Sequence, residues 1–400
     1  MGRENRLKLI KAIEEKRGSR VLTYICSDRQ GSAAQISDDA IPYMAEHLQK
    51  FGKVKHLDLF LYSRGGSVDA PWPIISLFRE HADKVGVLIP FRAHSAATLI
   101  ALGCDEVVMT ARAQLGPIDP ALNKITPQEG GTAVQEEIRV EDVMSFVGFI
   151  RDKAGLGDQA AVSANIKLLA EKLSPWVVGS LYRTHSHIRV VARKLLGTHV
   201  KPLDEQQLRL IVESLAEKTY SHGHAVGRRE AKELGLPVAK PEADIDALLL
   251  SLLADYERAL EIRKPVDPDA LLGADKDEAE SPMTIAMVES ADLLHAFQGT
   301  LKIKRLRQTP ANVNIQLNLG VQLPPGIPQQ AVPQEVIQQL VQQVQQAVPG
   351  LVMQQAKQQS PILRIEARRA VEEQQAAERL RGVGRPTIQV VPCSTEPFQL

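Results

Sequence analysis

The chain has 400 residues, with 48 basic and 48 acidic side chains and a formal net charge of zero. A balanced charge argues against a nucleic-acid footprint spread over the whole protein, so no nucleic-acid partner is expected. The three cysteines, Cys26, Cys104 and Cys393, are too far apart for a disulfide framework or a paired-cysteine zinc site. They fit a reducing compartment, and neither a metal nor another cofactor is expected.

The sequence predicts no secretory signal and no membrane span. Its charged start lacks the apolar core of a signal peptide. The most apolar stretch, ALLLSLLADYERALEIR from Ala247, is interrupted at Asp255 and is shorter than the ~20 apolar residues of a span. It predicts an amphipathic or core helix, and we expect a cytoplasmic protein.

The first third of the chain alternates between strand-like and helix-like segments. β-branched and aromatic runs predict the strands, and apolar residues at helical spacing predict the helices. Strict alternation with short links indicates a parallel sheet covered by helices. After a helix at 5–16, the strands are expected at 19–28, 56–63, 84–90 and 106–110, and the helices at 37–51, 70–83 and 96–103.

The rest of the chain divides into a helical part, a linker and a biased C-terminal region. Within the last region, alternation predicts a strand at 312–326, charge patterning predicts a helix at 362–382, and the tail beyond Gly382 is expected to be disordered. Helices are expected at 138–154, 158–172, 175–196, 205–219, 227–235 and 242–262. The predicted division is an N-terminal helical extension at 1–17, a main domain at 18–264, a linker at 265–311 and a Gln/Pro-rich region at 312–400.

Ser95 stands between an apolar strand-like run and an Ala-rich helix-like run, in IPFRAHSAATLIALGCDEVVM from Ile89. The free amides of a helix start favour developing negative charge, so this position suits a nucleophile. A serine that merely caps the helix would look the same locally, and capping serines are far more common.

Gly65 and Gly66 directly follow one predicted strand and precede a helix, in LFLYSRGGSVDAP. A tight turn alone would explain them, and no phosphate-loop motif is present. In a parallel sheet, however, this turn and the turn at Ser95 lie at the same edge. Acyl transfer needs an attacking oxygen opposite amide donors, and amides of Gly65 and Gly66 would form such an oxyanion hole.

Four segments together resemble the Clp protease/crotonase superfamily: SRGGSVDAP, AHSAATLIALGCDEVVM, AQLGPIDPAL and YSHGHAVGRREAKELGLPV. The closest resemblance is to the serine dehydrogenase proteinases, relatives of signal peptide peptidase A, and it spans about residues 18–240. It implies an α/β fold of the Clp/crotonase-like ββα spiral type with a mostly helical second half. It also implies a homo-oligomer, a peptide or protein substrate, Ser95 as nucleophile, and Gly65 and Gly66 at the oxyanion hole.

The general base is where the chain departs from this family pattern. A Clp-type protease has a histidine in the turn after the next strand, whereas Asp119 takes the approximate place here. A carboxylate acts as a base there only if burial raises its pKa. Signal peptide peptidase relatives use a lysine, and Lys124 is the nearest one downstream. His222 and His224 are weaker candidates.

The other histidines predict neither a base nor a metal site. His185 and His187 flank one residue on a predicted helix, so they point to different faces and make a poor chelate. His94 is expected to point away from Ser95, because adjacent side chains diverge.

Three functions fit these observations. The first is a serine hydrolase, in particular a peptidase, that works through an acyl-enzyme on Ser95. The second is a non-catalytic oligomeric scaffold of the same fold that has lost its base. The third is crotonase-like acyl-CoA chemistry, which uses backbone amides and does not need Ser95. Apolar faces at 175–196 and 205–219 predict a closed homo-oligomer built on a dimer or trimer.

Overall fold

The computed structural model describes residues 2–118, 121–127, 133–216, 224–273 and 276–307, and short pieces at 338–339, 341–342, 348, 362–370 and 387–392. The chain forms two compact units. The first comprises Met1–Val266, Met283–Gly299 and Val371–Thr395, and the second comprises Asp267–Pro282, Thr300–Ala370 and Glu396–Leu400.

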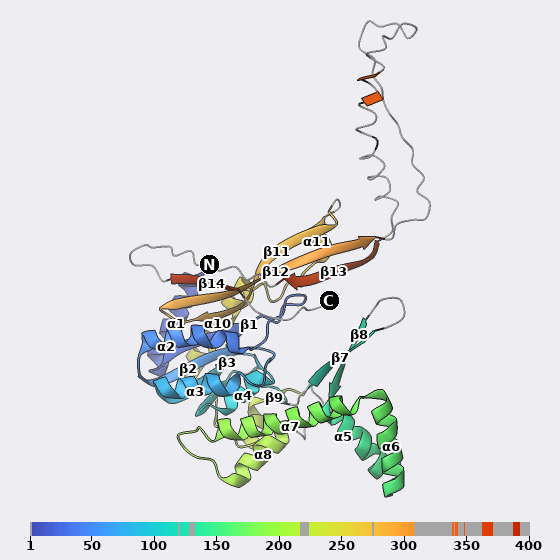
Figure 1. The fold of residues 1–400 in the computed structure, drawn as a ribbon. Helices are drawn as coiled ribbons and strands as arrows, with labels where there is room; N and C mark the ends of the chain where they lie inside the picture. The colour runs from blue at the N-terminus through green and yellow to red at the C-terminus, as the bar shows by residue number, and fades with distance from the viewer. Residues whose placement is uncertain are drawn as a thin grey trace. The chain divides into compact units, whose positions relative to one another are not determined.

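A central, mostly parallel sheet organises the first unit (Figure 1). Its parallel strands are β1 (Arg20–Cys26), β2 (Val54–Tyr62), β3 (Ala82–Ile89), β5 (Glu106–Met109) and β10 (Val238–Ala239). They lie in the order β10-β5-β3-β2-β1, and β11 (Glu278–Glu289) pairs antiparallel with β1. The alternation of strand and helix therefore produces the parallel sheet predicted from the sequence.

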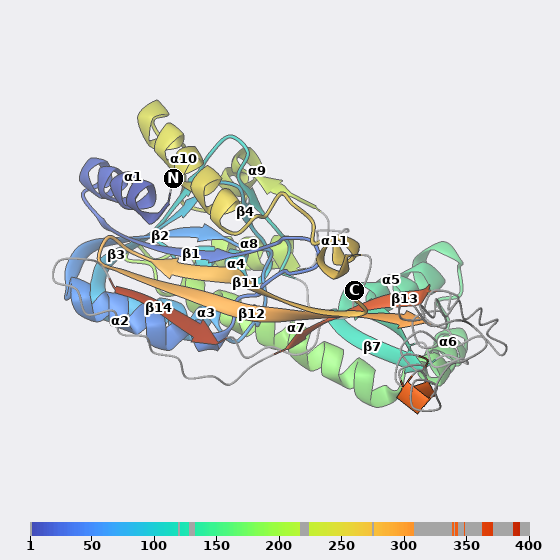
Figure 2. The same ribbon diagram turned by 90° about the horizontal axis from the view of Figure 1, so that it is seen from above.

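Helices cover both faces of this sheet, and each face has its own apolar core (Figure 2). Because side chains alternate along a strand, Leu22 and Tyr24 enter one core while Val21 and Ile25 enter the other. The first core includes α2 (Ile41–Phe51), α3 (Pro71–His81), α4 (Ala96–Leu102), α7 (Pro175–Leu196) and α8 (Glu205–Ala216). The second includes α1 (Arg3–Arg17) and α10 (Ala243–Ala259).

A second, small sheet gathers chain segments beside the start of α4. It consists of β4 (Arg92–Ala93), β6 (Gln114–Leu115) and β9 (Val226–Gly227), with β4 parallel and β9 antiparallel to β6. A bridge between Ser63 and Ala93 connects the end of β2 to β4. The segments after β2, after β6 and before β9 therefore converge on one place.

The stretch between β6 and α7 differs in part from the prediction. Residues 138 and 139, expected to start a helix, instead end β8 (Ala133–Arg139), which pairs antiparallel with β7 (Ala121–Pro127). Cross-strand pairing here overrides a local helix preference. The helices that follow are α5 (Val140–Gly148), a π-helix (Phe149–Lys153) and α6 (Gln159–Lys172), close to the predicted positions. η1 (Asp38–Ala40) and α9 (Arg228–Glu233) complete the helices before α10.

Much of the range 265–311, which was expected to be a linker, forms regular secondary structure. It contains α11 (Pro268–Leu272), β11 and β12 (Leu293–Arg307). Its charged residues are the outward half of alternating strands, where they pair: Lys302 Nζ lies 3.1 Å from Glu280 Oε1, and Lys304 Nζ lies 2.6 Å from Glu278 Oε1. The average composition of residues 265–311 is polar, so this alternation was not recognised in the sequence.

The C-terminal region also differs from the prediction where the structure describes it. β13 (Ile362–Ala370) pairs antiparallel with β12, so the helix expected to begin at 362 is a strand there. β14 (Thr387–Pro392) pairs parallel with β12 inside the stretch expected to be disordered. The strand predicted at 312–326 lies outside the described residues. Among the described helices, none has the length and apolar content to cross a membrane.

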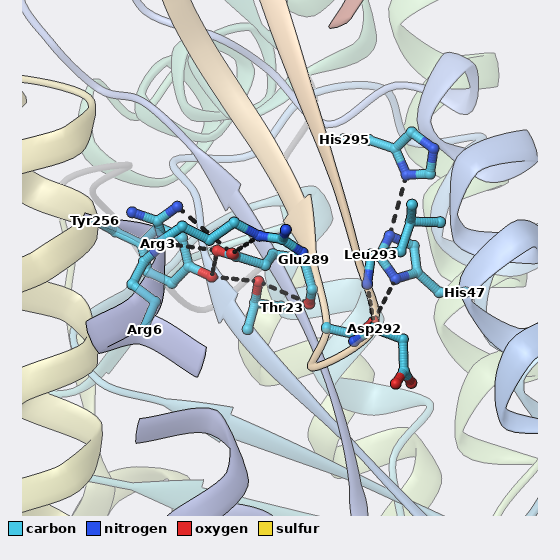
Figure 3. A network of polar contacts seen from close by, with 10 residues as sticks. Arg3, Arg6, Thr23, His47, Tyr256, Glu289, Asp292, Leu293 and His295 are labelled. Carbon is cyan, nitrogen blue, oxygen red and sulfur yellow. Dashed lines mark hydrogen bonds and ion pairs between the residues drawn. The ribbon is translucent and has the colours of Figure 1, made fainter. Parts of the chain in front are cut away.

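A buried polar network joins α1 and α10 to the end of β11 (Figure 3). The fully buried Glu289 accepts hydrogen bonds from Arg6 Nε at 2.6 Å, Arg3 Nε at 3.2 Å and the Tyr256 hydroxyl at 2.8 Å. Loss of this carboxylate would leave a buried guanidinium without its counter-charge. The network therefore fixes the N-terminal helix to the sheet.

A second buried contact set secures the turn between β11 and β12. His47 Nδ1 lies 2.8 Å from Ser290 Oγ, and His47 Nε2 lies 3.1 Å from His295 Nδ1 (Figure 3). Burial, followed by the nearby charge of His295, lowers the pKa of His47 from 6.5 to about 3. His47 is therefore a neutral hydrogen-bonding residue at neutral pH.

Candidate active site

Ser95 occupies a strained backbone position at the start of α4. Its φ is 51° and its ψ is −116°, a combination that non-glycine residues rarely adopt. Such a conformation costs on the order of 1–3 kcal/mol and persists only when the surrounding structure enforces it. A serine on a sharp strand-to-helix turn presents its hydroxyl outward, which is the geometry of a nucleophile.

The capping alternative for Ser95 is wrong in this structure. Ser95 is the residue that precedes α4, but its side chain makes no hydrogen bond to the first amides of the helix. An N-cap serine has an extended backbone and accepts such a bond. Ser95 has neither property, so capping does not account for a serine here.

Gly65 and Gly66 lie directly against Ser95 and against the loop before α2. A Cβ on Gly65 would lie 2.7 Å from Ser95 Cβ and 3.2 Å from Ser95 Oγ. A Cβ on Gly66 would lie 2.2 Å from the carbonyl oxygen of Ile36. Both glycines have positive φ, 118° and 152°, so both the space and the backbone conformation require glycine. The structure thus brings together the two turns that the sequence predicted to meet.

The backbone amides that are available to an oxyanion differ in part from the expected pair, Gly65 and Gly66. The Gly65 N–H donates to Ser63 Oγ at 3.0 Å, so it is already engaged. Within the described part of the chain, the N–H groups of Gly66 and Ala96 have no acceptor in the protein. Ala96 is the first residue of α4, and the first amides of a helix have no partner inside that helix. The sequence analysis did not identify Ala96 as an amide donor or Ser63 as the acceptor for the Gly65 amide. Their positions, Ala96 next to Ser95 and Ser63 two residues before Gly65, were the only available indication.

Gly116, three residues before Asp119, contacts both α4 and His94, the residue that precedes Ser95. The Gly116 N–H donates to Thr98 Oγ1 at 3.1 Å, which ties this segment to α4. A Cβ on Gly116 would lie 2.9 Å from His94 Cβ, so the His94 side chain packs on this glycine. His94 therefore packs against the segment that leads to Asp119, which itself lies outside the described residues.

The structure describes no base at the Ser95 hydroxyl. Among the described residues, no imidazole, carboxylate or amine forms a hydrogen bond with Ser95 Oγ. His222 lies outside those residues, and Lys124 is described only by its backbone, opposite Glu136 in the β7–β8 pair. His224 Nε2 lies 2.8 Å from Glu230 Oε1. β9 nevertheless brings the segment after His224 beside β6.

The paired histidines of α7 do not share a ligand. His187 Nε2 lies 2.9 Å from Asp69 Oδ1, in the loop after Gly66, whereas His185 lines a cavity beside α5. In the described ranges, no group of three His, Cys, Asp or Glu side chains is placed to hold a metal ion.

A basic cluster flanks the glycine turn. Arg64 Nε and Arg92 Nη1 lie 2.8 Å and 2.6 Å from Asp28 Oδ2, and the Tyr62 hydroxyl donates to Asp28 Oδ1 at 2.7 Å. Burial opposes the charge of Asp28, but the hydrogen bonds from Tyr62 and Arg64 outweigh it and lower the pKa of this carboxyl. Two arginines against one carboxylate leave a positive charge beside the site.

Comparison with known proteins agrees with this geometry. Residues 2–144, which contain Ser95 and both glycines, match the family model of ClpP-like SDH-type serine proteinases. The fold of this part of the chain is that of the ClpP-like class. The match of residues 2–144 to the SDH-type family within that class confirms the resemblance predicted from the sequence.

Two uncharacterized proteins of Methanocaldococcus jannaschii are similar in sequence. One is 26% identical over 270 residues, which cover 66% of this chain and 82% of that protein. The other is 30% identical over 135 residues, which cover 30% of this chain and 43% of that protein.

Two solved structures of the 1510-N membrane-bound stomatin-specific protease are also similar. A variant in complex with a substrate peptide has a TM-score of 0.32 and 14% identity and covers 56% of this chain and 77% of that one. A second variant has a TM-score of 0.33 and 15% identity and covers 57% and 83%. At this level of similarity, the activity of those proteins gives no information on the chemistry of this chain.

Proposed function

We propose that this chain is a serine peptidase that cleaves peptide bonds through an acyl-enzyme on Ser95. The observation that carries the proposal is the strained φ of 51° at Ser95, in a serine that caps no helix and lies against Gly65. Strain of this kind clusters at functional sites, where it presents a reacting group. The match of residues 2–144 to the model of a serine proteinase family supports the same reaction.

In the proposed reaction, Ser95 Oγ attacks the scissile carbonyl and forms a tetrahedral intermediate. The amides of Gly66 and Ala96 would donate to the oxyanion, because both are left without a protein acceptor in the described residues. Ser63 holds the Gly65 amide and so fixes the turn. Collapse of the intermediate expels the amine product, and water then hydrolyses the ester to release the acid product and restore Ser95.

Asp119 is the proposed proton acceptor for Ser95. Its support is chain position: it lies three residues after Gly116, which is tied to α4 through Thr98. A carboxylate with an ordinary pKa is a weak base, so the proposal requires burial to raise it. Asp119→Asn should lower kcat and remove the acid limb of the pH–rate profile; an unchanged profile would transfer this role to another residue.

The test of the peptidase proposal is turnover of a panel of unstructured fluorogenic peptides by the wild type and Ser95→Ala. Loss of turnover in Ser95→Ala with an unchanged thermal midpoint is expected. Equal turnover in both proteins would exclude Ser95 as nucleophile.

A second candidate is a non-catalytic scaffold of the same fold. The observation that favours it is the lack, among the described residues, of a base bonded to Ser95 Oγ. This candidate expects no turnover by the wild type on any peptide. For both candidate functions, peptidase and scaffold, we propose a homo-oligomer, as predicted from the sequence.

A further inference from the structure

Two arginines lie on the two chain segments that meet beside Ser95. Arg64 follows Ser63 at the start of the glycine turn, and Arg92 precedes Ala93, three residues before Ser95. A bridge between Ser63 and Ala93 holds the two segments side by side, with the Ser63 N–H donating to the carbonyl oxygen of Arg92 at 3.0 Å. Because consecutive Cα atoms are about 3.8 Å apart, the Cα of Arg92 lies within roughly 11 Å of the Cα of Ser95.

Asp28 holds both guanidinium groups in place. Its Oδ2 lies 2.8 Å from Arg64 Nε and 2.6 Å from Arg92 Nη1, and its side chain is only 4% exposed. The arginine side chains are more open, with exposed fractions of 57% for Arg64 and 27% for Arg92. A buried carboxylate therefore fixes two guanidinium groups that remain accessible to solvent.

Arg64 has donors left for another partner. Within the described residues, it bonds to Asp28 through Nε, and neither of its Nη nitrogens has an acceptor. A guanidinium presents its donors in a planar fork that matches a carboxylate. Because the Nε end is already anchored, less side-chain freedom is lost when a second carboxylate binds at the Nη end.

The Phe91 ring lies against Arg92 and a third arginine. Arg92 Cζ is 4.3 Å from the centroid of this ring, and Arg112 Cζ is 5.5 Å from it. Phe91 is half-buried and Arg112 is exposed. We name Arg64, Arg92 and Arg112 the arginine cluster. In the described part of the chain, its ion pairs involve one carboxylate, that of Asp28, so positive charge is in excess.

The fold does not require this excess of charge. One guanidinium would neutralise Asp28, whose other oxygen, Oδ1, already accepts a hydrogen bond from the Tyr62 hydroxyl at 2.7 Å. Like charges that are held close together repel each other. An anionic group bound at the arginine cluster would relieve this repulsion, so the cluster suits a negatively charged ligand.

We propose that the arginine cluster binds an acidic side chain of the peptide substrate, an aspartate or glutamate within about three residues of the cleaved bond. The inference rests on the proposed peptidase function and adds a substrate class to it. An extended peptide advances roughly 3.3–3.6 Å per residue, so three residues span about the separation of Ser95 and Arg92. The substrate carboxylate accepts hydrogen bonds from the Nη nitrogens of Arg64, and its methylene groups lie against Phe91.

Matched peptides test this preference. A neutral, unstructured fluorogenic peptide that the wild type cleaves receives Glu, or its neutral isostere Gln, at each of the three positions on either side of the cleaved bond. With Glu at one or more of these positions, kcat/KM should be at least about tenfold higher than with Gln, and the gain should shrink as the ionic strength rises. Arg64→Gln should reduce the Glu-to-Gln ratio to below about two, and Arg112→Gln should reduce it in part.

Lys55→Gln is the matched control. It removes one exposed positive charge from β2, the strand that leads to Arg64, but at the opposite end of that strand. This variant should keep the Glu-to-Gln ratio of the wild type. Thermal midpoints report whether each variant folds, and the exposed Arg112 supplies a variant if Arg64→Gln does not fold. Equal kcat/KM for every Glu and Gln pair, or a preference that neither arginine variant reduces, would overturn the proposal.

A binding measurement separates this inference from the peptidase proposal. Fluorescence anisotropy of the same peptides, labelled with fluorescein, measures their affinity for Ser95→Ala without turnover. A wild type that cleaves no peptide would end the peptidase proposal. The acidic subsite would still stand if Glu peptides bound at least about fivefold more tightly than Gln peptides and if Arg64→Gln removed this gain. Equal affinities for the Glu and Gln peptides would overturn the subsite whatever the catalytic result.

Discussion

A Cβ on Gly65 would lie 2.7 Å from Ser95 Cβ and 3.2 Å from Ser95 Oγ. The glycine therefore keeps open the space in which the serine hydroxyl lies. Gly65 follows β2, and Ser95 lies between β3, the next strand of the parallel sheet, and α4, so parallel order brings them to one edge of the sheet.

The first prediction concerns this contact. Gly65→Ala should lower turnover by at least about a hundredfold, because its Cβ must displace Ser95, and it should lose about 1–3 kcal/mol of stability from its φ of 118°. Gly18→Ala is the matched control, since Gly18 also has positive φ, 60°, but a Cβ there meets nothing within 4 Å. It should lose about 1 kcal/mol and keep its activity. Equal turnover in the two variants would contradict the contact argument.

The second prediction concerns backbone strain at Ser95. Ser95→Gly should raise the free energy of unfolding by about 1 kcal/mol or more, because glycine adopts a φ of 51° without penalty. Ser95→Ala retains a Cβ and loses no capping bond, so its stability should change by less than about 0.5 kcal/mol. Both variants should be inactive. Chemical denaturation measures the two stabilities, and a marked loss in Ser95→Ala would restore the capping interpretation.

The third prediction concerns pH. The pKa of His47 is about 3 in the folded protein, against 6.5 for the free group. Below pH 6.5 the unfolded chain gains a proton that the folded chain does not take up until about pH 3. The stability that His47 provides is therefore complete above pH 6.5 and declines as the pH falls, by about 1.4 kcal/mol per pH unit.

Denaturation of wild type and His47→Gln between pH 7 and 4 tests this linkage. The difference in stability between them should shrink as the pH falls, because the variant lacks the titrating group. His224→Gln is the control, because it removes a partly exposed imidazole instead of a buried one. A constant difference between wild type and His47→Gln would show that His47 takes no part.

The fourth prediction concerns the buried carboxylate of Glu289. Glu289→Ala should cost about 3–5 kcal/mol, because Arg6 remains buried without its counter-charge. Asp244→Ala removes the exposed partner of Lys16 and should change stability little. Thermal unfolding of both variants provides the comparison, and a small effect in Glu289→Ala would show that α1 contributes little to the fold.

The sequence predicted the parallel sheet and the meeting of Gly65 with Ser95, because alternating apolar runs and strand order are local patterns with a fixed spatial consequence. It did not predict β11 and β12, because their charged residues face outward and made the segment resemble a linker. It also gave no indication that Ser63 would occupy the Gly65 amide, since that depends on a turn geometry formed only in the fold.

The choice of glycine to substitute also depends on contacts that only the structure shows. From the sequence, a substitution at Gly66 would test the oxyanion position alone. In the structure, a Cβ on Gly66 would lie 2.2 Å from the Ile36 carbonyl oxygen, so such a variant tests the fold as well. Gly65 is the more informative position, because its nearest neighbour is the proposed nucleophile.

The most direct test of the proposed function is labelling of the folded wild-type protein with a fluorophosphonate, followed by peptide mass mapping. An activated serine is phosphonylated, whereas an ordinary surface serine is not. The account predicts one adduct, on Ser95, that is absent from Ser95→Ala and reduced in Gly65→Ala. A folded wild type that takes up no label, or labels at another residue while Ser95 stays unmodified, would contradict it.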